Sequence, residues 1–290
     1  MITTIDCVHT YCEDIVNTLS GLTSKKIVEI MNMQPNDLER YHRILVEMIE
    51  AKAKLETAEW FTNYLKGAIS YRGVKTPALK GILSEFFNES KLDKQPDIVQ
   101  LNHIRYWLSC PMAEDKLIAI LWLQKWLKLR RTKDDATVAV NQIFDLLEDV
   151  FASGEIHDWS TNDWLCVRVL ETIPLKHPEF VERLIGWHES TSVWRRRAGL
   201  LAFKKSAKTG HFHAEIEEII SKLLPSNERF IQTAIGWVLS DAARKHPDWA
   251  TRMFDSHFEE LSHEVITRHT KHLPSHVELK ERSRERRRRN

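Results

Sequence analysis

Apolar residues recur every three or four positions through much of the chain, which is the spacing of one face of an α-helix. The pattern is clearest over residues 116–127, 139–151, 164–170, 198–203 and 231–243. No alternation of period two is long enough to indicate a strand. Glycine and proline number nine each, where average usage predicts roughly twenty and fifteen. Helical periodicity with few helix breakers predicts an all-α chain with short loops.

The chain also resembles itself. The segment 170–180 recurs as 239–249, an offset of 69 residues, and both copies contain Lys-His-Pro followed by an acidic and an aromatic residue. The basic pair suits the end of one helix, and the proline suits the first turn of the next. Because 69 is close to two units of about 35 residues, the repeat predicts an α-α superhelix, or solenoid, of HEAT-like helical repeats with a concave face.

Three regions follow from this pattern. Residues 1–55 are expected to form N-terminal capping helices, residues 56–277 the HEAT-like repeat domain, and residues 278–290 a basic, disordered tail. An apolar helix face within the first region is formed by Ile44, Leu45, Met48 and Ile49.

The net charge of +1 is unevenly distributed. Residues 191–210 carry six basic side chains and no acidic one, and residues 280–290 carry seven basic and two acidic side chains. The rest of the chain therefore carries −10, since 1 − 6 − 5 = −10. Positive charge concentrated on an acidic body is typical of a surface that faces an anion such as a nucleic acid. For the tail, a solvated end is an equally good interpretation.

The cysteines favour a reducing compartment. Four of them lie irregularly in a chain without a signal peptide, at Cys7, Cys12, Cys110 and Cys166. Cys7 and Cys12 with His9 form a poor zinc pattern, because no second ligand pair follows at a suitable spacing. We therefore expect an intracellular protein, in the cytoplasm of a bacterium or the nucleus of a eukaryote, without a metal or cofactor. No apolar run approaches the roughly 18 residues that span a bilayer.

Three short segments carry candidate chemistry: 157–163, 194–198 and 235–239. Trp159 and Asp163 are four residues apart and share one side of a helix, and Trp194 and Arg197, three apart, do the same. A carboxylate, an arginine and several tryptophans delivered to one surface suit a cationic substrate beside a phosphate. The alternative is that the tryptophans are core and the charges solvated. Trp107, Trp122, Trp126 and Trp164 are expected to be core residues.

In order and spacing, four motifs resemble the AlkD family of DNA alkylation-repair glycosylases, which are built from HEAT-like repeats. The resemblance runs from about Trp60 to Trp249. The motifs are Tyr64-Leu65-Lys66 with Gly73-Val74-Lys75-Thr76-Pro77 downstream, Trp159-x-x-x-Asp163, Trp194-x-x-Arg197-Ala198, and Ile231-Gln232-x-Ala234-Ile235-Gly236-Trp237-Val238-Leu239.

The resemblance implies a monofunctional glycosylase that removes N3- and N7-alkylated purines, such as 3-methyladenine and 7-methylguanine, from duplex DNA in base excision repair. Asp163 would be the catalytic carboxylate, with Trp159 and Trp237 as aromatic walls. Arg197 would contact a phosphate and Tyr64 would contact DNA. The expected DNA-binding set, including neighbours in the basic segment, is Arg197, Tyr64, Trp194, Arg196 and Lys204. The partner would be double-stranded DNA containing alkylated bases, bound by a monomer.

Two positions depart from the family pattern. Ser240 stands where the family often has an arginine, and Ser160 where it usually has an acidic residue. Neither is the presumed catalytic carboxylate. Two other functions remain open: a repeat protein that binds damaged or branched DNA without cutting the glycosidic bond, and a protein-interaction scaffold.

Overall fold

The computed structural model describes residues 35–289, and within that range it contains helices and no strand. The all-α prediction is therefore confirmed. In chain order the α-helices are α3 (Pro35–Glu50), α4 (Leu55–Leu65), α5 (Thr76–Ser90), α6 (Asp97–Ser109), α7 (Ala113–Lys128), α8 (Lys133–Ala152), α9 (Trp159–Arg168), α10 (Ile173–Lys176), α11 (Val181–Ile185), α12 (Val193–Leu201), α13 (Lys204–Thr209), α14 (His213–Leu223), α15 (Arg229–Ala243), α16 (Pro247–Ser256), α17 (His263–His269) and α18 (His276–Arg289). No helix in the described part of the chain is long and apolar enough to cross a membrane.

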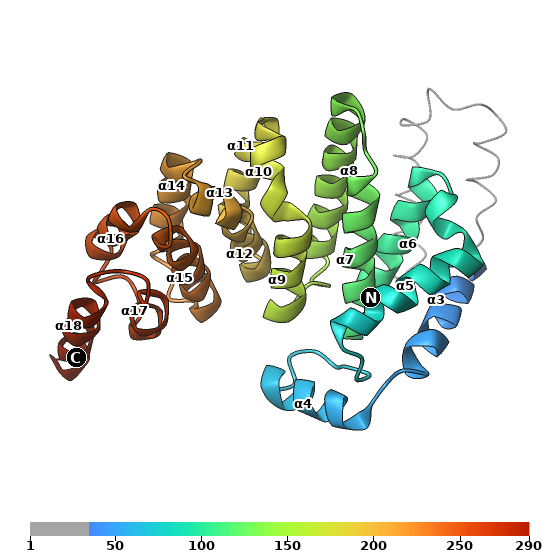
Figure 1. Ribbon diagram of the computed structural model, residues 1–290, viewed down its shortest axis with the longest axis horizontal. Coiled ribbons are helices and arrows are strands. Elements are labelled where there is room, and N and C mark those ends of the chain that lie inside the picture. The colour runs from blue at the N-terminus through green and yellow to red at the C-terminus, as the bar shows by residue number, and fades with distance from the viewer. Residues whose placement is uncertain (1–34, 290) are drawn as a thin grey trace.

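The helices stack side by side into a superhelix, from α3 at one end to α18 at the other (Figure 1). Some pack closely on the next helix in the chain, as α6 does on α7, α15 on α16 and α17 on α18. One layer of the stack contains α7, α9, α12, α15 and α17, each packed against the next. The hydrophobic core lies between this layer and the other helices that pack on it. Trp107, Trp122 and Trp126 are buried there, as the periodicity predicts. Trp164 is partly buried and packs against the same core.

The internal repeat predicted from the Lys-His-Pro strings is visible in the backbone. α10 ends at Lys176, and a short 3-10 turn begins at Pro178; α16 likewise begins at Pro247. The residue between has nearly the same conformation in both copies, with φ −135° and ψ 65° at His177 and φ −130° and ψ 59° at His246. The proline therefore opens a new helical turn at the same point of each copy.

The first described helix agrees with its prediction, and the C-terminal segment does not. In α3, Leu45 and Ile49 are buried, which agrees with the predicted apolar face; residues 1–34, with Cys7, His9 and Cys12, lie outside the described residues. The predicted disorder of residues 278–290 is wrong as far as residue 289, because α18 continues to Arg289. Leu279 and Ser283 bury one side of this helix.

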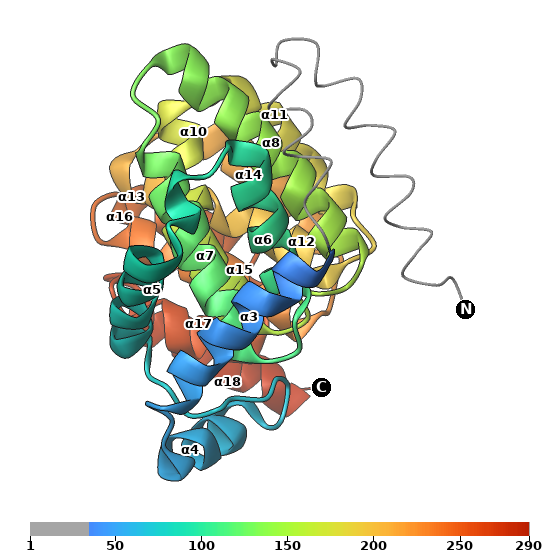
Figure 2. The same ribbon diagram turned by 90° about the vertical axis from the view of Figure 1, so that its right-hand side faces the viewer.

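α4 projects from the lower edge of the stack, as the end-on view shows (Figure 2). The loop that follows it is fixed by buried acids at the start of α7. The Glu114 carboxylate accepts backbone N–H bonds from Arg72, Gly73 and Val74 at 3.0, 2.8 and 3.0 Å. Gly73 has φ +108°, and a Cβ there would lie 2.2 Å from the Lys54 carbonyl oxygen. Only glycine fits this approach, which attaches the start of α4 to the loop.

Candidate functional site

The candidate site begins at the N-terminus of α9. Asp158 is fully buried and caps the helix by accepting the backbone N–H groups of Ser160 and Thr161 at 2.8 and 3.1 Å. The hydroxyl of Ser160 also donates to this carboxylate at 2.5 Å, so the serine that departs from the family pattern supports the cap. A side-chain cap of this kind typically contributes about 1 kcal/mol. It fixes the first turn of the helix that carries Trp159 and Asp163.

Asp163 lies against Arg197 of α12 in a two-point ion pair. Nε donates to Oδ1 at 2.7 Å and Nη2 donates to Oδ2 at 2.8 Å. Nη1 donates to the Phe230 carbonyl oxygen and, at 3.1 Å, to the Thr233 hydroxyl, both on α15. Four of the five guanidinium N–H groups are therefore used within the protein. The pair joins three helices and holds the carboxylate in one orientation.

Aromatic side chains surround this pair. Trp159 of α9 and Trp237 of α15 are both partly buried and pack against the core. Across from them, α4 presents Tyr64, whose ring meets Trp159 edge to face at 5.3 Å between centroids. Trp60 stacks on Tyr64 at 4.8 Å, and the two residues are 56% and 54% exposed. The three rings are in contact in series, from the exposed Trp60 through Tyr64 to Trp159.

One cleft of about 620 Å³ lies between Tyr64 at the end of α4 and a row formed by α9, α12, α15 and α17, called the helix row below. Of the residues expected from the sequence, Tyr64, Trp159, Asp163, Arg197 and Trp237 meet there. Side chains that sequence reasoning missed are Lys66 after α4, Arg229, Phe230 and Thr233 on α15, and Arg268 and His269 on α17.

The missed cations form the rim of the cleft. Arg229 and Arg268 share the carboxylate of Glu264, with Arg229 Nη2 at 2.7 Å and Arg268 Nη1 at 2.5 Å from Oε1. Both arginine side chains remain more than 60% exposed, so their charges face solvent at the cleft mouth. Two cations around one anion leave the rim positive. No local motif marks these residues, because they meet only when α15 packs on α17.

Gly236 is the feature of the sequence that indicates close packing of α15 on α17. A Cβ at Gly236 would lie 2.5 Å from the His269 ring, so the glycine in the Ile-Gly-Trp string allows α17 to approach α15 closely. Burial lowers the pKa of His269, which keeps its ring neutral at pH 7. The approach brings that ring into the cleft lining.

Three of the expected DNA-binding residues lie outside the cleft lining. Trp194 packs on Phe230 at 4.7 Å between ring centroids, and Arg196 is partly buried beside it on α12. Lys204 is held by Asp241 at 2.8 Å, and its ammonium lies 4.9 Å from the centre of the Trp237 ring. Lys204 therefore packs on Trp237, which lines the cleft, and does not line the cleft itself. Ser240, the other departure, does not line the cleft either.

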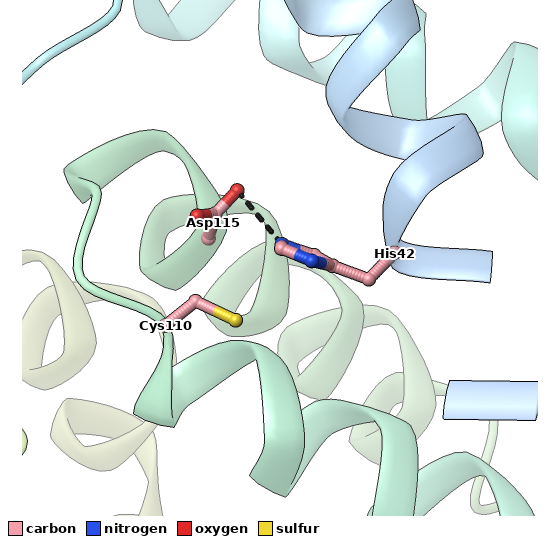
Figure 3. A group of neighbouring side chains, drawn as sticks. All are labelled: His42, Cys110 and Asp115. Carbon is pink, nitrogen blue, oxygen red and sulfur yellow. Dashed lines mark ion pairs between the residues drawn. The ribbon is translucent and has the colours of Figure 1, made fainter. Parts of the chain in front are cut away.

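A separate cluster of His42, Cys110 and Asp115 lies between α3 and the α6–α7 connection (Figure 3). His42 Nε2 is 3.3 Å from Asp115 Oδ1. The same carboxylate already binds Arg72 at two points, at 3.0 and 3.1 Å. Burial raises the pKa of the Cys110 thiol to about 12, so the sulfur is protonated at pH 7. Because Arg72 already pairs with the carboxylate and the thiol is protonated, the cluster is a polar packing contact between α3 and the α6–α7 connection.

Residues 45–273 match the model of the DNA alkylation repair enzyme family. This chain belongs to that family. Membership assigns it a role in DNA alkylation repair, with DNA as its partner. Among solved structures, a predicted DNA alkylation repair enzyme from Enterococcus faecalis is similar, with a TM-score of 0.63 and 17% identity over 77% of this chain and 97% of that one. That likeness shows a common fold. No curated protein matches the chain significantly.

Proposed function

We propose that this family member is a monofunctional DNA glycosylase of the AlkD type. It excises cationic N3- and N7-alkylated purines from duplex DNA as the first step of base excision repair. The observation that carries the proposal is the Asp163 carboxylate, fixed by Arg197 in an aromatic cleft whose outer residues remain exposed to solvent.

The chemistry of the lesion explains why one carboxylate is sufficient. An N3- or N7-alkylated purine already carries a positive charge, so the base leaves without a proton donor. The C1′–N bond breaks with its electron pair moving onto the base, which becomes neutral. Positive charge then develops on the deoxyribose in an oxocarbenium-like transition state. Water adds to C1′ and releases a proton. No metal or cofactor is required by these steps.

Asp163 would stabilise the developing cation and orient the attacking water. Its orientation is set before substrate binds, because Arg197 holds both carboxylate oxygens and is itself held by α15. A preorganised electrostatic group of this kind typically contributes about 2.7–4 kcal/mol to lowering a barrier. The faces of Trp159 and Trp237 would add cation–π attraction of about 0.5–2 kcal/mol each.

The cleft supports a mechanism that leaves the base unenclosed. One wall is the helix row, and the other is α4, whose Trp60 and Tyr64 are more than half exposed. The cations on the rim, Arg229, Arg268 and Lys66, suit the phosphates on either side of the lesion. Arg197 retains one N–H that its protein partners do not use, and we assign it to the phosphate next to the lesion. Selection would then rest on the lesion's own charge.

The test is release of free base from duplex DNA containing one N7-methylguanine, under single-turnover conditions with purified monomer. We expect excision by the wild type and loss of at least tenfold in Asp163→Asn, equivalent to at least about 1.4 kcal/mol. Both proteins should bind the duplex with similar affinity. If the wild type binds without excising, the chain is a non-catalytic DNA-binding repeat protein. If it does not bind DNA, the scaffold interpretation replaces the proposal.

A further inference from the structure

Helix α18 lies beyond residues 45–273, the segment that matches the family. It contains most of the chain's C-terminal positive charge, and the charges are sorted by face. At 3.6 residues per turn, positions 280, 284, 287 and 288 share one side of the helix and positions 278, 281 and 285 share another. The first side holds Lys280, Arg284, Arg287 and Arg288, and the second holds Glu278, Glu281 and Glu285.

A third side of α18 attaches the helix to the protein. Leu279 and Ser283 are buried, and Arg286 donates to the carbonyl oxygens of Phe258 and Leu261. The Arg282 guanidinium lies 4.2 Å from the centre of the Phe258 ring. These two arginines are used in packing, whereas Arg284, Arg287 and Arg288 are exposed. The fixed helix therefore presents its basic side in a defined direction.

α18 packs on α17, the helix that carries Arg268 and His269 of the cleft lining. Ser283 bonds His263 at the start of α17, at 2.8 Å. Burial lowers the pKa of His263, and the charges of Arg287 and Arg284 lower it further. The next residue, Glu264, pairs with Arg229 at the cleft rim. In Figure 1, α17 and α18 lie at the left end of the stack, and α4 projects below its middle.

We propose that the basic face of α18 (Lys280, Arg284, Arg287 and Arg288) binds the phosphate backbone of duplex DNA on one side of the cleft. The proposal rests on the proposed function, since it concerns the same duplex. From Lys280 to Arg288 the face extends about 12 Å at 1.5 Å per residue. This length matches three to four phosphates of one strand at about 3.4 Å of helix axis each. The contact carries no sequence information and extends the binding site beyond the lesion.

The experiment measures binding of an undamaged duplex of about 20 base pairs over a salt series, for full-length protein. The variant replaces the four basic residues by glutamine (K280Q/R284Q/R287Q/R288Q), which keeps helix propensity. Each lost phosphate contact should reduce the slope of log affinity against log salt by about 0.9. We expect a reduction of about 2 to 4 units for the four-residue variant. The two-residue variant R284Q/R287Q should lose about half as much.

A charge-matched control removes four exposed basic residues near the opposite edge, in K128Q/R131Q/K133Q/K176Q. The start of α7 contacts the loop after α4, as Ala113 N–H donates to the Ser70 carbonyl oxygen at 2.9 Å. Lys128 is at the other end of that helix, about 20 Å from the end that contacts the loop. This control should change the slope by less than one unit.

The two proposals fail in different ways. A four-residue α18 variant whose salt slope equals that of the control overturns the assignment of α18 to DNA, whatever the wild type excises. A wild type that binds DNA through α18 but releases no N7-methylguanine overturns the glycosylase proposal instead. In the α18 variant, the single-turnover excision rate at saturating protein should stay within about twofold of wild type, because the basic face is not part of the catalytic cleft.

Discussion

The two sides of the cleft are held in very different ways. On the helix row, the side chains of Asp163 and Arg197 are only 14% and 5% exposed, and their contacts connect α9, α12 and α15. On α4, by contrast, Trp60 and Tyr64 are 56% and 54% exposed, and only Thr57 and Leu65 of the helix are buried. One side is a fixed wall, and the other is a helix with little buried surface.

This difference separates two tasks. Stabilising a transition-state charge requires groups that do not reorganise, which suits the interlocked helix row. Admitting a duplex requires an element that moves at small free-energy cost, and an element with few buried apolar contacts is of that kind. Under the proposed function, the helix row would carry the chemistry and α4 would capture the substrate. Substitutions on the row should change stability or the rate of excision, and substitutions on α4 should change affinity.

The largest effect is expected from Arg197→Ala. Removing one partner of a largely buried ion pair leaves the other charge uncompensated, at a cost of about 3–5 kcal/mol. We expect the free energy of unfolding in urea to fall by about 3 kcal/mol, the lower end, because Asp163 keeps some exposure. Excision should fall at the same time, because Asp163 loses its orientation.

Arg195→Ala is the matched control for that variant. Arg195 is on the same helix and pairs with Glu148 at 3.2 Å, with both side chains 26% exposed. A pair of this kind contributes about 1 kcal/mol or less. Equal destabilisation by the two substitutions would show that the Asp163–Arg197 pair stabilises the packing of α9, α12 and α15 no more than an ordinary surface pair does.

An intermediate effect is expected at Trp237. Its ring is backed by Lys204 and faces the cleft, so its quadrupole is available to a developing cation. Single-turnover excision should decrease in the order Trp, Phe, Leu at this position. The loss in Trp237→Leu should be about 2- to 30-fold, from 0.5–2 kcal/mol. Affinity for undamaged duplex should change little. A leucine variant with the wild-type rate would remove the aromatic wall from the mechanism.

The smallest effect is expected at Trp60 on α4. Trp60→Ala removes an exposed ring stacked on Tyr64, so the free energy of unfolding should change by less than about 1 kcal/mol. Affinity for the lesion duplex should decrease by about two- to tenfold, corresponding to a stacking contribution of about 0.5–1.5 kcal/mol. The excision rate at saturating protein should remain unchanged. Leu55→Ala, which is 75% exposed on the same helix, serves as the control and should bind normally. A lower excision rate for Trp60→Ala at saturating protein would show that α4 takes part in the chemical step.

Local spacing was sufficient to predict an all-α chain and to place Trp159 and Asp163 on one side of α9. It was not sufficient to identify the protein partners of Arg197, which donates four of its N–H groups to Asp163 and to α15. That geometry depends on how α9, α12 and α15 pack, which no single segment encodes.

The arginine-rich end shows the same limit. Its composition is typical of a disordered tail, yet the Phe258 and Leu261 carbonyl groups, more than twenty residues earlier, accept the Arg286 guanidinium and help to anchor a helix. The sequence does not predict the pairing of Arg229 and Arg268 with one carboxylate, because Arg229 is on α15 and Glu264 is on α17. Long-range pairs of this kind appear only after folding.

The central claim is that an unenclosed cleft with one fixed carboxylate selects lesions by their charge. The most direct measurement compares single-turnover release of N7-methylguanine, a bulkier cationic N7 adduct and neutral hypoxanthine from the same duplex sequence. We expect similar rates, within about tenfold, for the two cationic lesions. Hypoxanthine release should be slower by at least about 100-fold, equivalent to about 2.7 kcal/mol of barrier. Efficient hypoxanthine release, or sharp rejection of the bulky cation, would contradict the central claim by showing that a base-enclosing pocket governs selection.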